Sequence, residues 1–270
     1  MKDSDIKKLQ EVELQILKDF DAYCTKHGID YSLSGGTLLG AVRHQGFIPW
    51  DDDTDSIMTR ENHKKFFKAW EEDPMEGYVL QNVYTDPTCG NNHTKIRKKG
   101  TKFLTEGEED RGDFSGIWID LFVMDKVDNN EEALAYMRKT GREIYKITRG
   151  YATSRHDGVK RKLQRAVLRA MYNEKNIPQK YAEADQALQK FADTENDFVW
   201  MDVACEPEMY RVLPANLADE YVRLPFCDGQ FKVFKEYDKI LTIRFGDYMQ
   251  LPPVEQRVCL HNPSVIITGE

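Results

Sequence analysis

Two periods of apolar spacing along the chain separate predicted helices from predicted strands. Residues 5–27 carry an apolar side chain at every third or fourth position, and Gly28 suits the end of such a helix. Residues 116–127, GIWIDLFVMDKV, are the most apolar stretch and are typical of a buried strand. The same patterns predict strands at 29–33, 78–83, 94–104, 222–226 and 230–233, a turn at 34–37, helices at 38–42, 60–72 and 237–245, and a mixed region that includes 198–203.

The stretch from 131 to about 195 has a different pattern, with three helical segments broken near residues 150–158 and at Pro178. The 270 residues are 40% apolar and 31% charged, which is enough apolar material for a core. We see no internal repeat, low-complexity segment or linker. We therefore predict an α+β fold, organised as one domain over residues 1–270 with a helical subregion at about 131–195.

The charge distribution argues against a nucleic-acid-binding protein. The net charge is −8, and the two basic clusters, at residues 95–102 and 160–169, are small. Apolar residues Leu163, Val167 and Leu168 interrupt the second cluster at helical spacing, which is typical of the solvated face of a helix. A substrate that carries phosphate remains compatible with this composition.

The amino terminus, the apolar runs and the cysteine content do not predict a secreted or membrane-spanning protein. The first ten residues, MKDSDIKKLQ, lack the apolar core of a secretory signal, and no apolar run approaches the roughly 20 residues of a membrane span. Five scattered cysteines without a CxxC pair favour reduced thiols. We expect a cytoplasmic location, with contact at the inner face of a membrane left open.

A zinc site combining Cys259 and His261 with Cys205 or Cys227 has little support from the spacing.

Residues 51–55, DDDTD, place four aspartates directly after an apolar run and before Ile57 and Met58. Such a segment is a solvated loop, or some of its acids are protonated, or a cation lies among them. In an extended chain Asp51, Asp53 and Asp55 share one face, where carboxylates suit Mg²⁺. A calcium loop of the EF-hand type is excluded, because its sixth and twelfth positions are Ser56 and Asn62 here.

Two further features have to be weighed with these acids. Gly35-Gly36 lies between a predicted strand and a predicted helix, where backbone N–H groups can approach a phosphate, although most such pairs are simple turns. Asp120 interrupts an apolar strand, where an acid without a partner is costly to bury. Either it faces the polar side of a half-exposed strand, or it shares a metal with Asp53 and Asp55.

A glycine pair, paired acids and a later lone acid on a strand resemble the nucleotidyltransferase superfamily, which includes the catalytic core of DNA polymerase β. Sixteen residues separate Gly36 from Asp53, more than is usual there, and Thr54 and Ser56 stand where apolar residues are usual. The stretch GGTLLGAVRHQGFIPWDDDTD looks like the signature of the LicD family, which has this longer spacing. HTKIRKKGTKF, GIWIDLFVMD and FGDYMQLPP with a later histidine also resemble that family; residues 131–200 do not.

The resemblance implies a nucleotidyltransferase core with a mixed β-sheet and a metal-dependent phosphotransferase. Such enzymes transfer phosphocholine, often from CDP-choline, to a sugar hydroxyl of a cell-surface glycan or its lipid-linked precursor. Asp53 and Asp55 then become ligands of Mg²⁺, with Mn²⁺ as an alternative metal, Asp51 a helper, and Asp120 a third ligand or general base. The implied phosphate-binding residues are Gly35, Gly36, Thr37, Arg43, Lys95 and Arg97.

Several alternatives remain open at this point. Lys95 and Arg97 either bind an anion or lie on an exposed strand face, and we expect His261 at the surface rather than on a phosphate. For Trp50 and Tyr248 we favour the core over stacking on a base or choline. Rival functions are a polyol-phosphate transferase, a glycosyltransferase that uses Asp-x-Asp, and a non-catalytic scaffold. One helix and one short strand before Gly35 argue against the nucleotide-binding unit of a glycosyltransferase.

Overall fold

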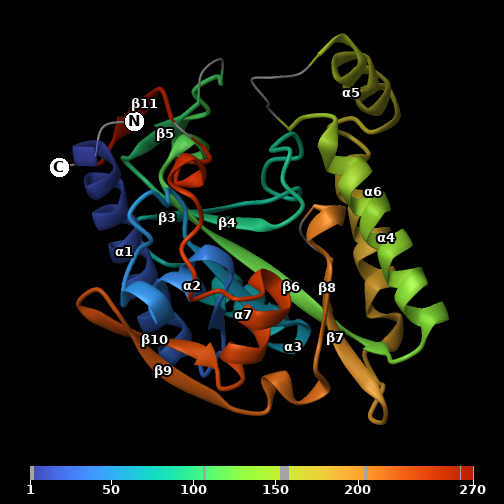
Figure 1. Cartoon of the computed structure of the whole chain (residues 1–270). Helices are drawn as coiled ribbons and strands as arrows, with labels where there is room; N and C mark the ends of the chain where they lie inside the picture. The colour runs from blue at the N-terminus through green and yellow to red at the C-terminus, as the bar shows by residue number, and fades with distance from the viewer. Residues whose placement is uncertain (1–2, 106–107, 153–157, 204–205, 262, 270) are drawn as a thin grey trace. The chain divides into compact units, whose positions relative to one another are not determined.

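A computed structural model describes residues 3–105, 108–152, 158–203, 206–261 and 263–269 (Figure 1). Its element order confirms the mixed α+β class. In chain order the helices are α1 (Asp3–Lys26), α2 (Gly35–His44), α3 (Arg60–Glu72), α4 (Glu131–Arg149), α5 (Val159–Met171), α6 (Ile177–Leu188) and α7 (Tyr237–Phe245). The strands are β1 (Ser32–Leu33), β2 (Asp55–Thr59), β3 (Tyr78–Gln81), β4 (Thr94–Lys98), β5 (Lys102–Leu104), β6 (Trp118–Asp128), β7 (Phe198–Asp202), β8 (Arg211–Leu213), β9 (Tyr221–Phe226), β10 (Gly229–Phe234) and β11 (Val265–Ile267).

The main sheet has the strand order β1-β2-β6-β4-β3, and β7 joins it by pairing with β6 and β8. β1 and β2 are antiparallel, with Leu33 opposite Ser56. On the other side of β2, the Asp120 backbone N–H of β6 donates to the carbonyl of Thr54 at 2.7 Å. This register places the beginning of β2 beside the middle of the apolar stretch that was predicted as a strand.

The chain divides into two compact units. Unit 1 comprises residues 1–79, 95–121 and 216–270, and unit 2 comprises residues 80–94 and 122–215. In unit 1, Phe20 of α1 packs edge-on against Tyr31 and against Phe66 of α3, so these aromatic rings anchor both helices to one core. In unit 2, α4 packs against α6 around a separate core (Val127, Ala133, Met137, Ile144, Leu188, Met201 and Val203).

Most predicted elements are confirmed, and the boundaries that differ have local causes. The predicted strand 94–104 is two strands, because the chain turns at Gly100, whose φ of +73° is accessible mainly to glycine. β5 then pairs with β11, a short strand that the sequence pattern missed. The predicted break near Pro178 is confirmed, because residues 172–176 separate α5 from α6; Pro178 itself lies in the first turn of α6, where a missing N–H costs no helical hydrogen bond.

The predicted turn at residues 34–37 was wrong, because α2 begins at Gly35. Ser34 is the extended N-cap residue, and both glycines lie in the first turn. The N–H groups of a first turn have no partner within the helix, so glycine weakens the helix less there than in its interior. The glycine pair therefore marks a helix start directly beside β2.

Among the described residues, none of the helices combines the length and apolar character needed to cross a membrane. The four described cysteines (Cys24, Cys89, Cys227 and Cys259) are free thiols. Cys205, a candidate zinc ligand, lies outside the described residues.

Candidate functional site

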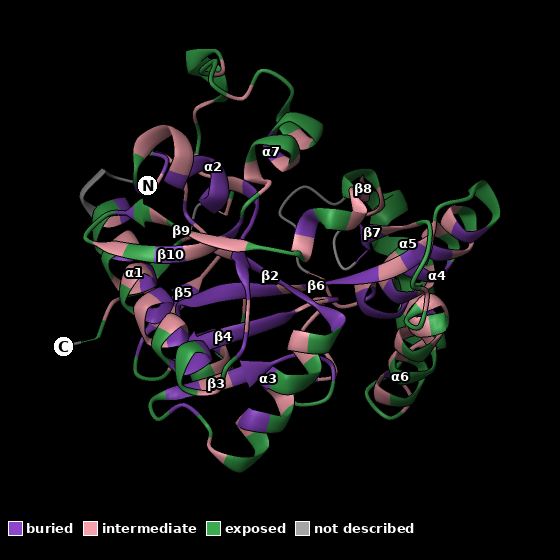
Figure 2. Cartoon of the chain, turned by 90° about the horizontal axis from the view of Figure 1, so that it is seen from below, coloured by how far each residue is buried: buried purple, intermediate pink, exposed green. Residues whose placement is uncertain are grey.

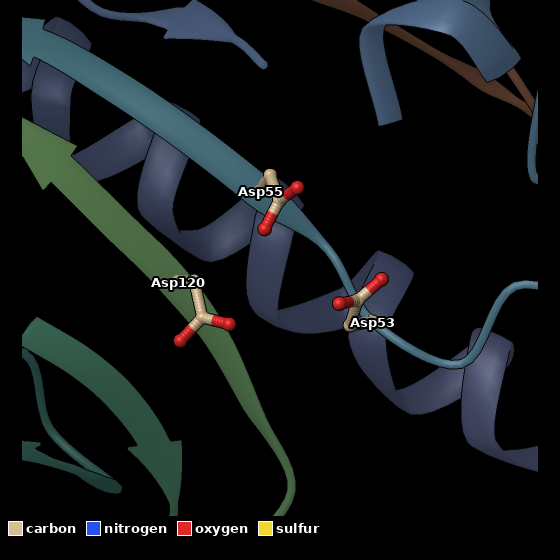
Figure 3. A group of neighbouring side chains, drawn as sticks. All are labelled: Asp53, Asp55 and Asp120. Atoms are coloured by element: carbon tan, nitrogen blue, oxygen red, sulfur yellow. The ribbon is translucent and has the colours of Figure 1, made fainter. Parts of the chain in front are cut away.

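Three aspartates meet where the loop before β2, the start of β2 and the neighbouring strand β6 come together (Figure 3). Asp53 lies on the loop, Asp55 begins β2 and Asp120 lies on β6. One carboxylate oxygen from each residue lies within 4.8 Å of the other two. The structure therefore brings Asp120 beside two acids that are more than sixty positions earlier in the sequence.

The local chain does not follow the predicted strand geometry throughout. β2 begins only at Asp55, so residues 51–54 form a loop. The predicted alternation of the side chains still holds, because Asp52 and Thr54 are buried whereas Asp51, Asp53 and Asp55 are partly accessible. The loop thus presents alternate carboxylates to the site although it makes no strand pairing there.

Without a metal ion, the buried carboxylates of this group destabilise one another's charged forms. Burial raises the pKa of Asp55 well above its ordinary value, and the charges of Asp53 and Asp120 raise it further. The pKa of Asp53 is raised for the same first reason, although His261 acts in the opposite direction. Oxygen-rich, partly desolvated clusters of this kind suit a hard divalent cation such as Mg²⁺.

The distances also suit such an ion. Two oxygens bound to one Mg²⁺ lie at most about 4 Å apart, since each Mg–O bond is about 2.0–2.1 Å. The observed limit of 4.8 Å exceeds this by an amount that a small side-chain rotation removes. Asp53, Asp55 and Asp120 therefore fit a metal site in both donor chemistry and spacing.

Asp51 is close to this group but not part of it. Burial and the charge of Asp53 raise the pKa of Asp51 to about 8, and the two side chains are hydrogen-bonded. The group of three carboxylates that suits a metal does not include it. Asp51 therefore contacts Asp53 through a hydrogen bond, and its predicted direct contact with the metal remains a prediction.

The two glycines at the start of α2 make room for these acids. A Cβ atom added to Gly35 would overlap the carboxylate of Asp55, and one added to Gly36 would lie 2.6 Å from Oδ2 of Asp51. Gly35 also has a φ of +54°, which disfavours any other residue. We had interpreted the pair as a cradle for phosphate, and the structure adds a second reason for the absence of side chains.

Replacing Gly35 by alanine should therefore cost more than its backbone angle alone. Gly28 is a matched control, because its φ is +63° and nothing lies within 4 Å of an added Cβ. We expect Gly28→Ala to lower the free energy of unfolding by about 1 kcal/mol. Gly35→Ala should cost roughly 1–3 kcal/mol more, because Asp55 must move. Urea unfolding measures both, and equal losses in the two variants would contradict this role.

Thr37 and Arg43, also predicted phosphate ligands, have structural contacts. The Thr37 hydroxyl accepts the backbone N–H of Asp55 at 2.8 Å and so holds the start of β2 against α2. Arg43 donates from Nη1 to the backbone carbonyls of Tyr248 and Gln250, at 2.8 and 3.3 Å. Arg43 therefore connects the end of α2 to the C-terminal segment.

Lys95 and Arg97 do not lie on an exposed strand face, because both side chains are buried in β4. Nζ of Lys95 is 3.3 Å from Oδ1 of Asp120 and 3.6 Å from the centre of the Trp118 ring. The guanidinium of Arg97 lies over the same ring at 4.7 Å and donates to the carbonyl of Gly116 at 2.5 Å. The exposed-face alternative is therefore wrong for both residues, and anion binding by Lys95 and Arg97 stays a prediction.

Trp118 is the residue of this cluster that sequence reasoning missed. Its ring supports Lys95 and Arg97, and its Nε1–H donates to Oδ2 of Asp120 at 3.1 Å. Asp120 is therefore buried with a cation on one oxygen and a donor on the other, which answers why an acid interrupts this strand. The i, i+2 spacing of Trp118 and Asp120 could have indicated this contact, because residues two apart in a strand lie on the same face.

His261, which we expected at the surface, keeps 35% of its side chain exposed but also contacts the acidic loop. Its backbone N–H donates to Oδ2 of Asp52 at 3.0 Å, and its Nδ1 lies 3.2 Å from Oδ1 of the same carboxylate. Nδ1 is also 3.9 Å from Oδ2 of Asp53. Burial alone would lower the pKa of His261, but the hydrogen bond to Asp52 and the charge of Asp53 raise it. Asp52, which faces away from the other acids, thus holds a histidine beside them.

Trp50 and Tyr248 are half-buried, so the preferred assignment of both to the core was wrong. The guanidinium of Arg257 lies 5.5 Å from the Trp50 ring, and the Tyr248 hydroxyl donates to Asp238 at 2.5 Å. Glu13 of α1 is a buried acid that the sequence pattern did not predict as part of the site. Its pKa is raised well above the ordinary value by burial and then by Asp53. Its position on an otherwise apolar face of the predicted helix could have indicated that this acid is buried.

The chain matches the family model described as "LicD/FKTN/FKRP, nucleotidyltransferase domain" over residues 28–146. It is 30% identical over 267 residues to the lipopolysaccharide cholinephosphotransferase LicD of Haemophilus influenzae, covering 95% of this chain and 96% of that protein. An uncharacterised protein of Rickettsia typhi is 34% identical over 117 residues, which is 43% of this chain and 35% of that protein. The family match contains both glycines, all the acids of the cluster, Lys95 and Arg97.

Proposed function

The chain belongs to the LicD family, and we propose that it transfers phosphocholine from CDP-choline to a sugar hydroxyl of a cell-surface glycan or its lipid-linked precursor. It is an enzyme of the class that transfers phosphorus-containing groups. The observation that carries the proposal is the group of Asp53, Asp55 and Asp120 within 4.8 Å, flanked by a buried lysine. The relative named as a lipopolysaccharide cholinephosphotransferase supports phosphocholine as the transferred group and a glycolipid as the acceptor.

In the proposed reaction the acceptor hydroxyl oxygen bonds to the phosphorus of the phosphocholine group. The bond from that phosphorus to the bridging oxygen breaks, CMP leaves with the electron pair, and the hydroxyl proton passes to a base. Phosphoryl transfer of this type depends mainly on positioning and on neutralising charge. A Mg²⁺ held by Asp53, Asp55 and Asp120 would neutralise the donor diphosphate and the developing charge on CMP.

The protein's own residues have separable tasks in this scheme. Lys95, fixed by Trp118 and by Asp120, provides positive charge for a donor phosphate beside the acids. We assign Asp120 as third metal ligand or as base for the acceptor hydroxyl. Gly35 and Gly36 keep the start of α2 free of side chains, so that backbone N–H groups and the helix dipole favour an anion there.

The donor can be identified by thermal stabilisation of the full chain. With Mg²⁺ present, we expect CDP-choline at about a hundredfold excess over its dissociation constant to stabilise the protein by roughly 2–3 kcal/mol. CDP-glycerol, CDP-ribitol and UDP-sugars serve as matched comparisons, and omission of Mg²⁺ as the control. A response only to CDP-glycerol or CDP-ribitol would indicate a polyol-phosphate transferase, and a response only to UDP-sugars a glycosyltransferase. Either result would overturn the phosphocholine assignment.

A further inference from the structure

Helix α5 of unit 2 exposes its apolar side chains to solvent. Surface helices normally turn their apolar face toward the core. Within the part of the chain that the structure describes, α5 has no fully buried residue; eleven of its thirteen residues are exposed, and Arg165 and Leu168 are partly covered (Figure 2). The exposed fractions of four apolar residues are large: Val159 85%, Leu163 66%, Val167 53% and Met171 56%. We had expected this basic stretch to be an ordinary solvated helix face, and its apolar half is solvated as well.

These apolar residues form one stripe. At about 100° per residue, Val159, Leu163, Val167 and Met171 fall within roughly 120° of the helix circumference. The small residues Ala166 and Ala170 lie on the same side and are also exposed. The stripe is therefore continuous along all the turns of α5.

The opposite face of α5 is the one that contacts the protein. Nε of Arg169 donates to the carbonyl of Gly150 at 2.7 Å, and the Arg165 side chain donates to the carbonyl of Ala152. Leu168, which directly precedes Arg169, is half-buried. Because this face anchors the helix to the end of α4, the apolar stripe points away from the unit that carries it.

The charge of α5 identifies the chemistry of a partner. The helix carries five cations and no acid, on a chain whose net charge is −8. At 100° per residue Lys160 and Lys162 lie near the two edges of the apolar stripe, and neither forms an ion pair within the described residues. An apolar stripe bordered by lysines suits a surface that is apolar inside and anionic outside, which is the interface of a membrane with acidic lipids.

We propose that α5 lies in the headgroup region of a membrane that contains anionic lipids and holds the protein at that surface. The stripe of Val159, Leu163, Val167 and Met171 enters the boundary between headgroups and acyl chains. Lys160 and Lys162 contact lipid phosphates from its edges, as long cationic side chains do at interfaces. The inference is independent of the group that the enzyme transfers.

The test is co-sedimentation of the full chain with vesicles of phosphatidylcholine alone or of phosphatidylcholine mixed with phosphatidylglycerol. We expect binding to the anionic vesicles that weakens with salt, and much weaker binding to the neutral ones. Leu163→Ser with Val167→Ser should reduce the partition coefficient at least about tenfold. Lys160→Gln with Lys162→Gln should reduce it by about fivefold for each cation, and only on anionic vesicles.

Matched controls come from the same unit. Met209→Ser removes another exposed apolar side chain, and Lys139→Gln with Arg142→Gln removes two exposed cations from α4. Both should bind like the unmodified chain, and all variants should keep its melting temperature because the altered side chains are exposed. Absence of binding to anionic vesicles, or equal loss in the controls, would overturn the proposal. So would a dimer in solution that Leu163→Ser with Val167→Ser converts to a monomer, because the stripe would then bind a second copy.

Discussion

Asp53→Asn and Asp55→Asn should each reduce phosphocholine transfer by at least about a thousandfold while the protein stays folded. Both residues belong to the group of three carboxylates that fits a divalent cation. Asparagine keeps the size of the side chain and removes the charge that a hard cation requires. Initial rates with CDP-choline and Mg²⁺, together with circular dichroism, measure the two effects. Full activity in either variant would refute the metal assignment.

The same substitutions should make the metal-free protein more stable. Burial, followed by the charges of neighbouring acids, raises the pKa of Asp55. A carboxyl group with a raised pKa binds its proton more tightly in the folded chain, so the folded state loses stability as the pH rises above the ordinary value. Asp55→Asn removes this cost, and its melting temperature without metal should exceed that of the unmodified chain more at pH 8 than at pH 5.

Asp113→Asn is the control for both measurements, because Asp113 is an exposed acid of unit 1. It should change neither activity nor the pH dependence of the melting temperature. A melting temperature of Asp55→Asn that stays below that of the unmodified chain at pH 8 would show that the acids are not in repulsion.

Lys95→Met should destabilise the metal-free protein by about 3–5 kcal/mol. Lys95 is buried, and its Nζ lies 3.3 Å from a carboxylate oxygen of buried Asp120. Removing the cation leaves that carboxylate beside Asp53 and Asp55 without its ion-pair partner. Chemical denaturation measures the loss, and transfer activity should fall at least about a hundredfold because a donor phosphate loses its charge partner.

Saturating Mg²⁺ should reduce the stability deficit of Lys95→Met, because a bound divalent cation supplies the positive charge that the lysine had provided. Lys99→Met is the matched control, since Lys99 is exposed at the end of β4. It should lose neither stability nor activity. A deficit in Lys95→Met that is the same with and without Mg²⁺ would separate the lysine from the metal site.

Individual residues show how far the sequence could predict this site. The acids at 53 and 55 and the lone acid at 120 could be grouped in advance, because an ionisable residue in an apolar strand requires a partner. The burial of Lys95 and Arg97 could not, because it depends on the Trp118 ring that both cover. The same holds for His261, whose partner Asp52 is 209 positions away.

The sequence by itself determined most of the helices and strands, the mixed α+β class and the candidate acids Asp53, Asp55 and Asp120, since these follow from local periodicity and from side-chain chemistry. Tertiary structure alone decided which side chains meet. The pairing of β6 with β2 brings Asp120 to Asp55, the C-terminal segment brings His261 to Asp52, and α5 turns its apolar stripe outward. Each of these depends on contacts between segments far apart in the chain, which local pattern does not encode.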